Sequence, residues 1–117
     1  MTPLVCDLDR EAFWVLLLDG KNKVIGINVV AVGSLTACLV HCREVYKPAI
    51  VGNAAAIVLV HNHPSLQPDA SAEDVALTRR LREAGVLLGI AVIDHVIVTA
   101  DGRYRSLADD GHLGDSR

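Results

Sequence analysis

Two histidines and a carboxylate stand at a spacing that suits one metal ion. His61 and His63 follow an apolar run over residues 55–60, and Asp74 comes ten intervening residues after His63. At the end of a twisted strand both imidazoles can face one ion, and the loop behind them can return a carboxylate. Two histidines and one carboxylate are the ligands of a catalytic zinc site, which keeps a fourth position for water. The sequence therefore predicts that His61, His63 and Asp74 bind zinc.

Such a site would support hydrolysis. Zinc lowers the pKa of its bound water to about 7, and Ser71, three residues before Asp74, could donate a hydrogen bond to an oxyanion on a carbonyl. The competing interpretation is structural, because a histidine beside a buried strand is more often a hydrogen-bonded core residue. The abrupt change from an apolar run to two histidines, followed by Ser71 and Asp74, favours the metal site.

The elements that would position these residues follow from apolar runs and turn signals. Strands are predicted over residues 13–18, 24–32, 39–41, 55–60, 90–99 and 104–107, and helices over residues 43–53 and from Ser71 to Gly85 or Gly89. The second helix has an apolar stripe of Leu77, Leu81, Ala84 and Leu88. This order predicts an α/β fold, a mixed β-sheet flanked by helices.

Two polar features disturb this pattern. Pro48 lies within the first predicted helix and is comfortable only in a first turn, so that helix either starts near Tyr46 or has an irregular first turn. Asp94 and His95 interrupt an otherwise apolar strand and need partners if they are buried. Orienting a ligand histidine is one role that they could have.

Composition limits the class of protein. The 117 residues suit one domain over residues 1–117, with a core over about 11–108 and a tail after 109 that we expect to be mobile. The hydrophobic fraction of 51% excludes disorder, and no apolar run is long enough for a membrane span. The net charge of −3 and the aromatic fraction of 3% argue against a nucleic-acid partner. The sequence has three cysteines, and its N-terminus carries no secretory signal, so we predict a cytoplasmic protein.

The pattern His61-x-His63-Pro64 followed by Ser71-x-x-Asp74 resembles the JAMM (MPN+) metalloprotease motif. The longer stretches CREVYKPAI, AAAIVLVHNHPS and TRRLREAGVLLGIAVIDHVIV are similar to the RadC-like JAB branch, and the likeness runs from about residue 11 to 112. The resemblance implies a cytidine-deaminase-like JAB/MPN fold and zinc on His61, His63 and Asp74. It also implies hydrolysis of a peptide or isopeptide-like amide bond in a peptide or protein substrate.

The resemblance also points to a general base. JAMM enzymes use a glutamate at the start of the first core strand, and Glu11 stands at that place; Glu44, at a predicted helix start, is the alternative. RadC-like proteins usually have glycine where this chain has Leu66, and proline where it has Ala70. Both positions lie between the ligands, so they change the shape of the loop and leave the ligand set intact.

Two other functions stay open. A non-catalytic MPN-type scaffold has the same fold, but such domains typically lack the ligands that this chain has. A DNA-associated RadC-like accessory factor is opposed by the acidic charge balance, and we expect this chain to lack the N-terminal helical module that RadC-like proteins often carry. The edges of a mixed sheet could also pair two chains into a homodimer. The sequence does not identify the substrate.

Overall fold

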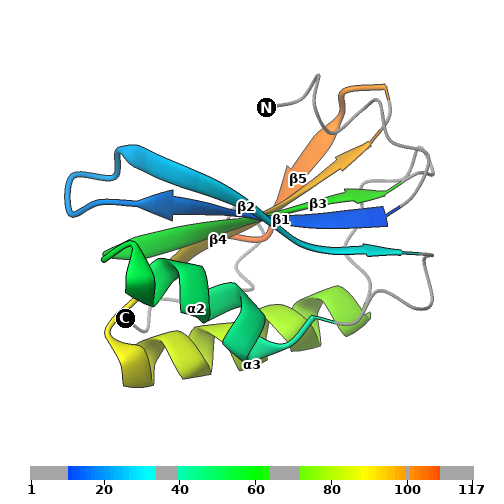
Figure 1. Cartoon of the computed structure of the whole chain (residues 1–117). Coiled ribbons are helices and arrows are strands. Elements are labelled where there is room, and N and C mark those ends of the chain that lie inside the picture. Colours follow the sequence, from blue (N-terminus) through cyan, green and yellow to red (C-terminus); the bar gives the residue numbers. More distant parts are fainter. Residues whose placement is uncertain (1–10, 34–39, 64–71, 100, 109–117) are drawn as a thin grey trace.

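A computed structural model describes residues 11–33, 40–63, 72–99 and 101–108 of the chain. These residues form a five-stranded mixed sheet with two helices, an α/β fold consistent with the JAB/MPN fold (Figure 1). The predicted fold class is confirmed. The elements are β1 (Glu11–Leu18), β2 (Val24–Gly33), α2 (Cys42–Val51), β3 (Ala56–His63), α3 (Ala72–Leu88), β4 (Ala91–Thr99) and β5 (Tyr104–Ser106).

The sheet topology gathers three chain segments at one end of the molecule. The strand order is β2-β1-β3-β4-β5. β1 runs antiparallel to β3 with Phe13 opposite His61, so the start of β1 lies beside the end of β3. β3 and β4 are parallel, and α3 is the crossover between them. The start of α3 therefore lies at the same end as the end of β3, on the right in Figure 1.

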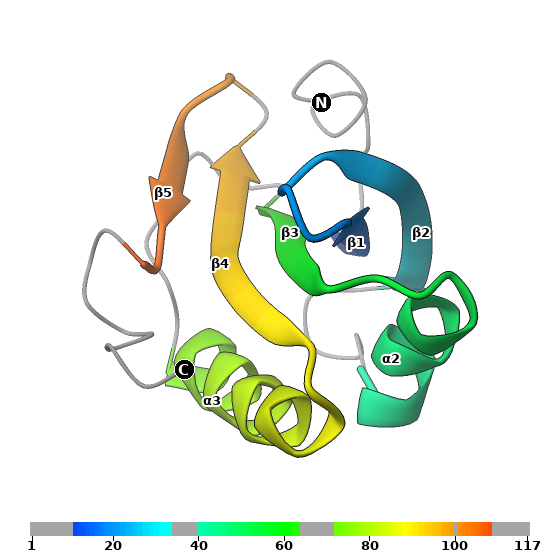
Figure 2. The ribbon, with the colours of Figure 1, turned by 90° about the vertical axis from the view of Figure 1, so that its left-hand side faces the viewer.

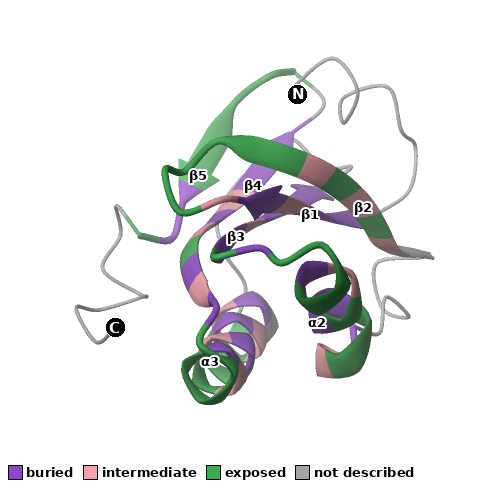
Figure 3. Ribbon diagram, turned by 60° about the vertical axis from the view of Figure 1, so that its left-hand side comes forward, coloured by how far each residue is buried: buried purple, intermediate pink, exposed green. Residues whose placement is uncertain are grey.

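Both helices pack on one face of the sheet (Figure 2). Strand alternation directs Phe13, Val15 and Leu59 to that face, where they form one core cluster with Tyr46 of α2 and Leu81 of α3. A second apolar cluster contains Ala12, Trp14, Val60 and Val98. Their alternation with the first set places them on the opposite face. Figure 3 shows the buried inner strands between the more exposed β2 and β5.

The predicted hairpin between the first two strands is confirmed. Asp19 Oδ1 accepts hydrogen bonds from the backbone N–H groups of Lys21 (2.8 Å) and Lys23 (2.9 Å). Asn22 has a φ of 63°, a left-handed conformation that asparagine tolerates better than most residues. Of the helices that the structure describes, neither could span a lipid bilayer.

The structure corrects two predictions around the first helix. Val40 and His41 lie outside any strand, and His41 directly precedes α2, so the predicted strand over 39–41 is wrong for these two residues; Leu39 lies outside the described residues. The helix also runs continuously from Cys42 to Val51 with Pro48 inside it. Pro48 has no N–H for the Glu44 carbonyl, and because Glu44 is exposed, water can solvate that carbonyl.

β3 is longer than its apolar run. It continues through His61 to His63, which lies opposite Thr99 of β4, so the prediction that the strand stops at His61 is wrong. The reason is that strand pairing uses backbone groups, which find partners in β4 whatever the side chain is.

The second helix is confirmed over the described residues Ala72–Leu88, and Gly89 follows it with a φ of 75°. Gly85 lies inside the helix, so it is not the stop. Leu88 is 47% exposed and does not belong to a buried stripe. Ser71, where the sequence predicts the start of this helix, lies outside the described residues.

A β-bulge decides which polar residue of β4 faces the helices. Ile57 lies opposite Val92, but Val58 lies opposite Asp94, so β4 has one extra residue at this point. Strict alternation from the buried Val92 would direct Asp94 toward the helices. The bulge directs His95 there instead, and His95 is fully buried.

Candidate metal centre

His61 and Asp74 meet in the interior of the protein. His61 lies near the end of β3, Asp74 lies in the first turn of α3, and His61 Nδ1 is 3.3 Å from Asp74 Oδ1. The exposed fractions of the two residues are only 5% and 6%. The structure therefore brings two of the three proposed ligands together.

Burial makes this contact different from a surface ion pair. Removing a carboxylate from water costs several kcal/mol unless it is paired and hydrogen-bonded. The N-terminal turn of α3 offsets part of that cost, because the positive end of the helix dipole stabilises the negative charge of Asp74.

The separation of the two atoms fits neighbouring ligands of zinc. In a tetrahedral site with bonds of about 2.1 Å, two ligand atoms lie about 3.4 Å apart. Among the side chains that the structure describes, no group of three histidine, cysteine, aspartate or glutamate residues could hold a metal. The structure describes the backbone of His63 but not its side chain, so the three-ligand site stays a prediction.

The proposed catalytic residues are described to different extents. Glu11 is the first residue of β1, and the β1–β3 register brings that end of the strand beside the end of β3; the side chain of Glu11 lies outside the described part. Glu44 is exposed in the first turn of α2. Ser71, together with Leu66 and Ala70, lies outside the described residues. The choice of general base stays a prediction.

Asn62, between the two histidines, has a role that the spacing did not indicate. Its Oδ1 accepts a hydrogen bond from the backbone N–H of Ala12 at 2.5 Å, and its exposed fraction is 3%. This bond joins the start of β1 to the end of β3 next to Phe13 and His61, where the two strands stop pairing. Only the cross-strand register could have revealed this contact.

Three further buried side chains surround the pair of His61 and Asp74. Thr78 Oγ1 donates a hydrogen bond to the Asp74 carbonyl oxygen at 2.7 Å and lies 2.5 Å from His95 Nδ1. The ring of Phe13 lies 5.7 Å from the ring of His61 and 5.5 Å from that of His95. The polar interruption of an apolar strand indicated that His95 needs a partner if buried, but the sequence carries no signal for Thr78 or Phe13.

Asp94, the neighbour of His95, contacts the chain around β5. Its carboxylate accepts hydrogen bonds from Ser106 Oγ (2.5 Å), from the backbone N–H of Ala108 (3.0 Å) and from the backbone N–H of His95 (2.7 Å). Asp94 therefore links β4 to β5 and to the residues that follow it, whereas His95 points toward the helices.

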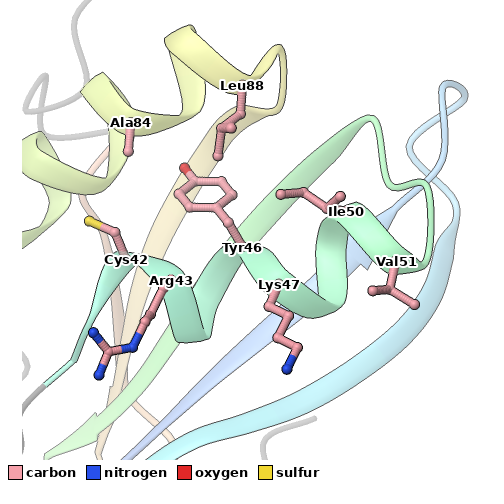
Figure 4. Close-up of a pocket in the computed structure, with 8 residues that line it drawn as sticks. All are labelled: Cys42, Arg43, Tyr46, Lys47, Ile50, Val51, Ala84 and Leu88. Atoms are coloured by element: carbon pink, nitrogen blue, oxygen red, sulfur yellow. The ribbon is translucent and has the colours of Figure 1, made fainter.

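A pocket of about 320 Å³ lies between α2 and α3, and none of the predicted site residues lines it (Figure 4). Tyr46 reaches across it from α2, and its hydroxyl donates to the Leu81 carbonyl oxygen at 2.6 Å. Burial, and secondarily the neighbouring Cys42, raises the pKa of Tyr46 far above its usual value. The lining is mainly apolar: Cys42, Arg43, Tyr46, Lys47, Ile50, Val51, Ala84 and Leu88.

Comparisons with known proteins agree with the motif and the fold. A sequence model of the RadC-like JAB domain matches residues 1–112. The chain is 52% identical over 107 residues to a UPF0758 protein of Pelobacter propionicus, 54% over 106 residues to one of Desulfitobacterium hafniense and 47% over 113 residues to one of Methanosarcina mazei. These matches cover 92%, 91% and 97% of this chain but 46%, 46% and 49% of the relatives, so the chain spans about half their length. The chain therefore belongs to the family of RadC-like JAB domains.

Proposed function

We propose that the protein is a zinc-dependent hydrolase of the JAMM type that cleaves a peptide or isopeptide-like amide bond. His61, His63 and Asp74 would hold the zinc. The observation that carries the proposal is the buried contact between His61 Nδ1 and Asp74 Oδ1, whose 3.3 Å separation suits two ligands of one ion. Membership of the RadC-like JAB family supports the same ligand set.

The residues around the site would have separate roles. When bound, zinc would lower the pKa of a water molecule to about 7. Glu11 would take a proton from the attacking water and pass it to the leaving amine, and its position at the start of β1 supports this role. Ser71 would donate a hydrogen bond to the carbonyl oxygen as negative charge develops on it. Glu44 is the second candidate for the base.

The proposal includes a cellular setting. Cys42 is a free, half-buried thiol, which suits the reducing cytoplasm. The partner would be a peptide or protein substrate, and a second copy of the chain could pair along an edge of the sheet. A non-catalytic scaffold of the same fold and a DNA-associated accessory factor are the alternative functions.

Zinc affinity tests the proposal without knowledge of the substrate. We expect the purified protein to bind one zinc ion per chain in competition with a chromophoric chelator. Because loss of a ligand exceeds the roughly 10–100-fold effect of losing an outer-shell partner, His61→Ala and Asp74→Asn should each weaken binding by at least about a hundredfold.

The matched control is His41→Ala, which removes an exposed histidine that precedes α2 and should leave zinc affinity unchanged. A wild-type protein that binds zinc no more tightly than His61→Ala would contradict the proposal. Such a result would favour the scaffold, or the accessory factor if the protein also bound DNA in a salt-dependent way.

A further inference from the structure

Thr78 and His95 link the helix that carries Asp74 to the sheet that carries His61. Thr78 belongs to α3, one turn after Asp74, and His95 belongs to β4, the strand beside β3. Their exposed fractions are 1% and 0%. The pair therefore lies in the interior, where an unsatisfied polar group costs more than in water.

The Thr78 hydroxyl lies between His95 and the backbone of Asp74. The hydroxyl has a single hydrogen, which it donates to the Asp74 carbonyl oxygen at 2.7 Å. Thr78 Oγ1 also lies 2.5 Å from His95 Nδ1, and a hydroxyl oxygen that donates its own hydrogen can still accept one from a protonated ring nitrogen. A chain of two hydrogen bonds thus runs from the imidazole through the hydroxyl to the backbone of Asp74.

His95 also contacts the other side of the site. Its ring centroid lies 6.0 Å from that of His61 and 5.5 Å from that of Phe13, with an edge-on arrangement against Phe13. Only the bulge in β4 directs His95 to this face of the sheet. One imidazole therefore packs against His61 while it holds the α3 turn that contains Asp74.

Asp74 needs such a support. It is the third residue of α3, and the first turn of a helix is its least stable part, because its N–H groups have no partner inside the helix. A shift of this turn would move the carboxylate away from His61 Nδ1, 3.3 Å distant. Metal sites depend on outer residues that fix the orientation of the ligands.

We propose that Thr78 and His95 are positioning residues that hold Asp74 beside His61 and thereby set the affinity of the site for zinc. This inference rests on the proposed function, because it assigns a role in the same metal site. Neither residue would touch the metal; His95 acts through Thr78, and Thr78 acts through the backbone of Asp74.

Zinc titration of paired variants tests the link. Thr78→Val removes the hydroxyl at similar size and should weaken zinc binding by about 10–100-fold, whereas Thr78→Ser keeps the hydroxyl and should stay within about threefold of the wild type. The amide nitrogen of asparagine can take the place of His95 Nδ1, but that of glutamine lies one carbon further out. His95→Asn should therefore bind zinc more tightly than His95→Gln.

Tyr46→Phe is the matched control, because Tyr46 also gives a buried hydrogen bond to a carbonyl of α3, that of Leu81. Tyr46→Phe should lower the unfolding temperature and leave zinc affinity unchanged. If the role of Thr78 were purely structural, Thr78→Val would behave in the same way. Wild-type affinity in Thr78→Val would overturn the inference alone, while absence of zinc binding in the wild type would overturn the proposed function and this inference with it. If Thr78→Val does not fold, equal affinities of His95→Asn and His95→Gln overturn the inference.

Discussion

At the scale of single residues, Tyr46 shows how burial couples ionisation to stability. The residue is 2% exposed, and its phenol donates a hydrogen bond to the Leu81 carbonyl oxygen. Burial disfavours the phenolate, and Cys42 adds to the effect, so the pKa of Tyr46 is raised in the folded protein. The folded state therefore holds this proton at pH values where the unfolded chain has already released it.

The protein should lose stability in alkali through Tyr46. A raised folded pKa gives a contribution that is complete below the unfolded value of about 10 and is lost as pH rises above it. Tyr46→Phe should cost about 1 kcal/mol at pH 7 and flatten the decline between pH 9 and 11. Urea unfolding across this range measures both effects. Tyr104→Phe, at a residue 67% exposed, is the control, and an equally steep decline in Tyr46→Phe would refute the assignment.

At the scale of elements, Gly85 allows α3 to approach both α2 and the chain entering β4. A Cβ built on Gly85 would lie 2.3 Å from the Ile90 carbonyl oxygen and 2.6 Å from Tyr46 Oη. Both are closer than carbon and oxygen atoms can pack. Gly85 therefore stands inside the helix for a packing reason, although glycine weakens a helix by about 0.5–1 kcal/mol relative to alanine.

We expect Gly85→Ala to destabilise the protein despite its better helix propensity. Overpacking of this kind costs about 1–3 kcal/mol, which exceeds the propensity gain, and thermal unfolding followed by circular dichroism would measure the difference. Gly20→Ala is the control, because nothing lies within 4 Å of a Cβ built there. Equal unfolding temperatures for Gly85→Ala and the wild type would show that the helices separate without cost.

At the scale of the whole molecule, β3 is the centre of the fold. It has β1 on one side and β4 on the other, and its residues contribute to the apolar clusters on both faces of the sheet. The outer strands differ, because β2 exposes Val24, Ile25, Ile27 and Val29 to about half their area and β5 has only three residues.

Hydrogen exchange should follow this arrangement. Amides of Ile57–Val60 should exchange most slowly, through global unfolding, because each is hydrogen-bonded to β1 or β4 in the middle of the sheet, between the two apolar clusters. Amides of β5 should exchange faster by local opening, as should those of β2 that face away from β1. Exchange measured by NMR would decide, and protection in β5 equal to that in β3 would contradict this order. Protection along the outer side of β2 that rises with protein concentration would instead indicate pairing of two chains.

Local patterns in the sequence determined much of this protein. The apolar runs predicted the strands within a few residues at most ends, and the spacing of His61 and Asp74 predicted that they meet, because both depend on short-range geometry: alternation, helix signals and the length of one loop. The prediction was wrong at His63, because backbone pairing with β4 extends the strand beyond its apolar run. It was also wrong at Pro48, because Glu44 is exposed and water can solvate the carbonyl that has no N–H from Pro48.

Only the tertiary structure decided which residues surround His61 and Asp74. The bulge that turns His95 inward, the Ala12–Asn62 hydrogen bond and the link from Thr78 to His95 all depend on the register between strands and on the packing of α3 against β4. These contacts join residues distant in the chain. Their geometry is fixed by how whole elements pack together, and no local spacing in a single sequence records it.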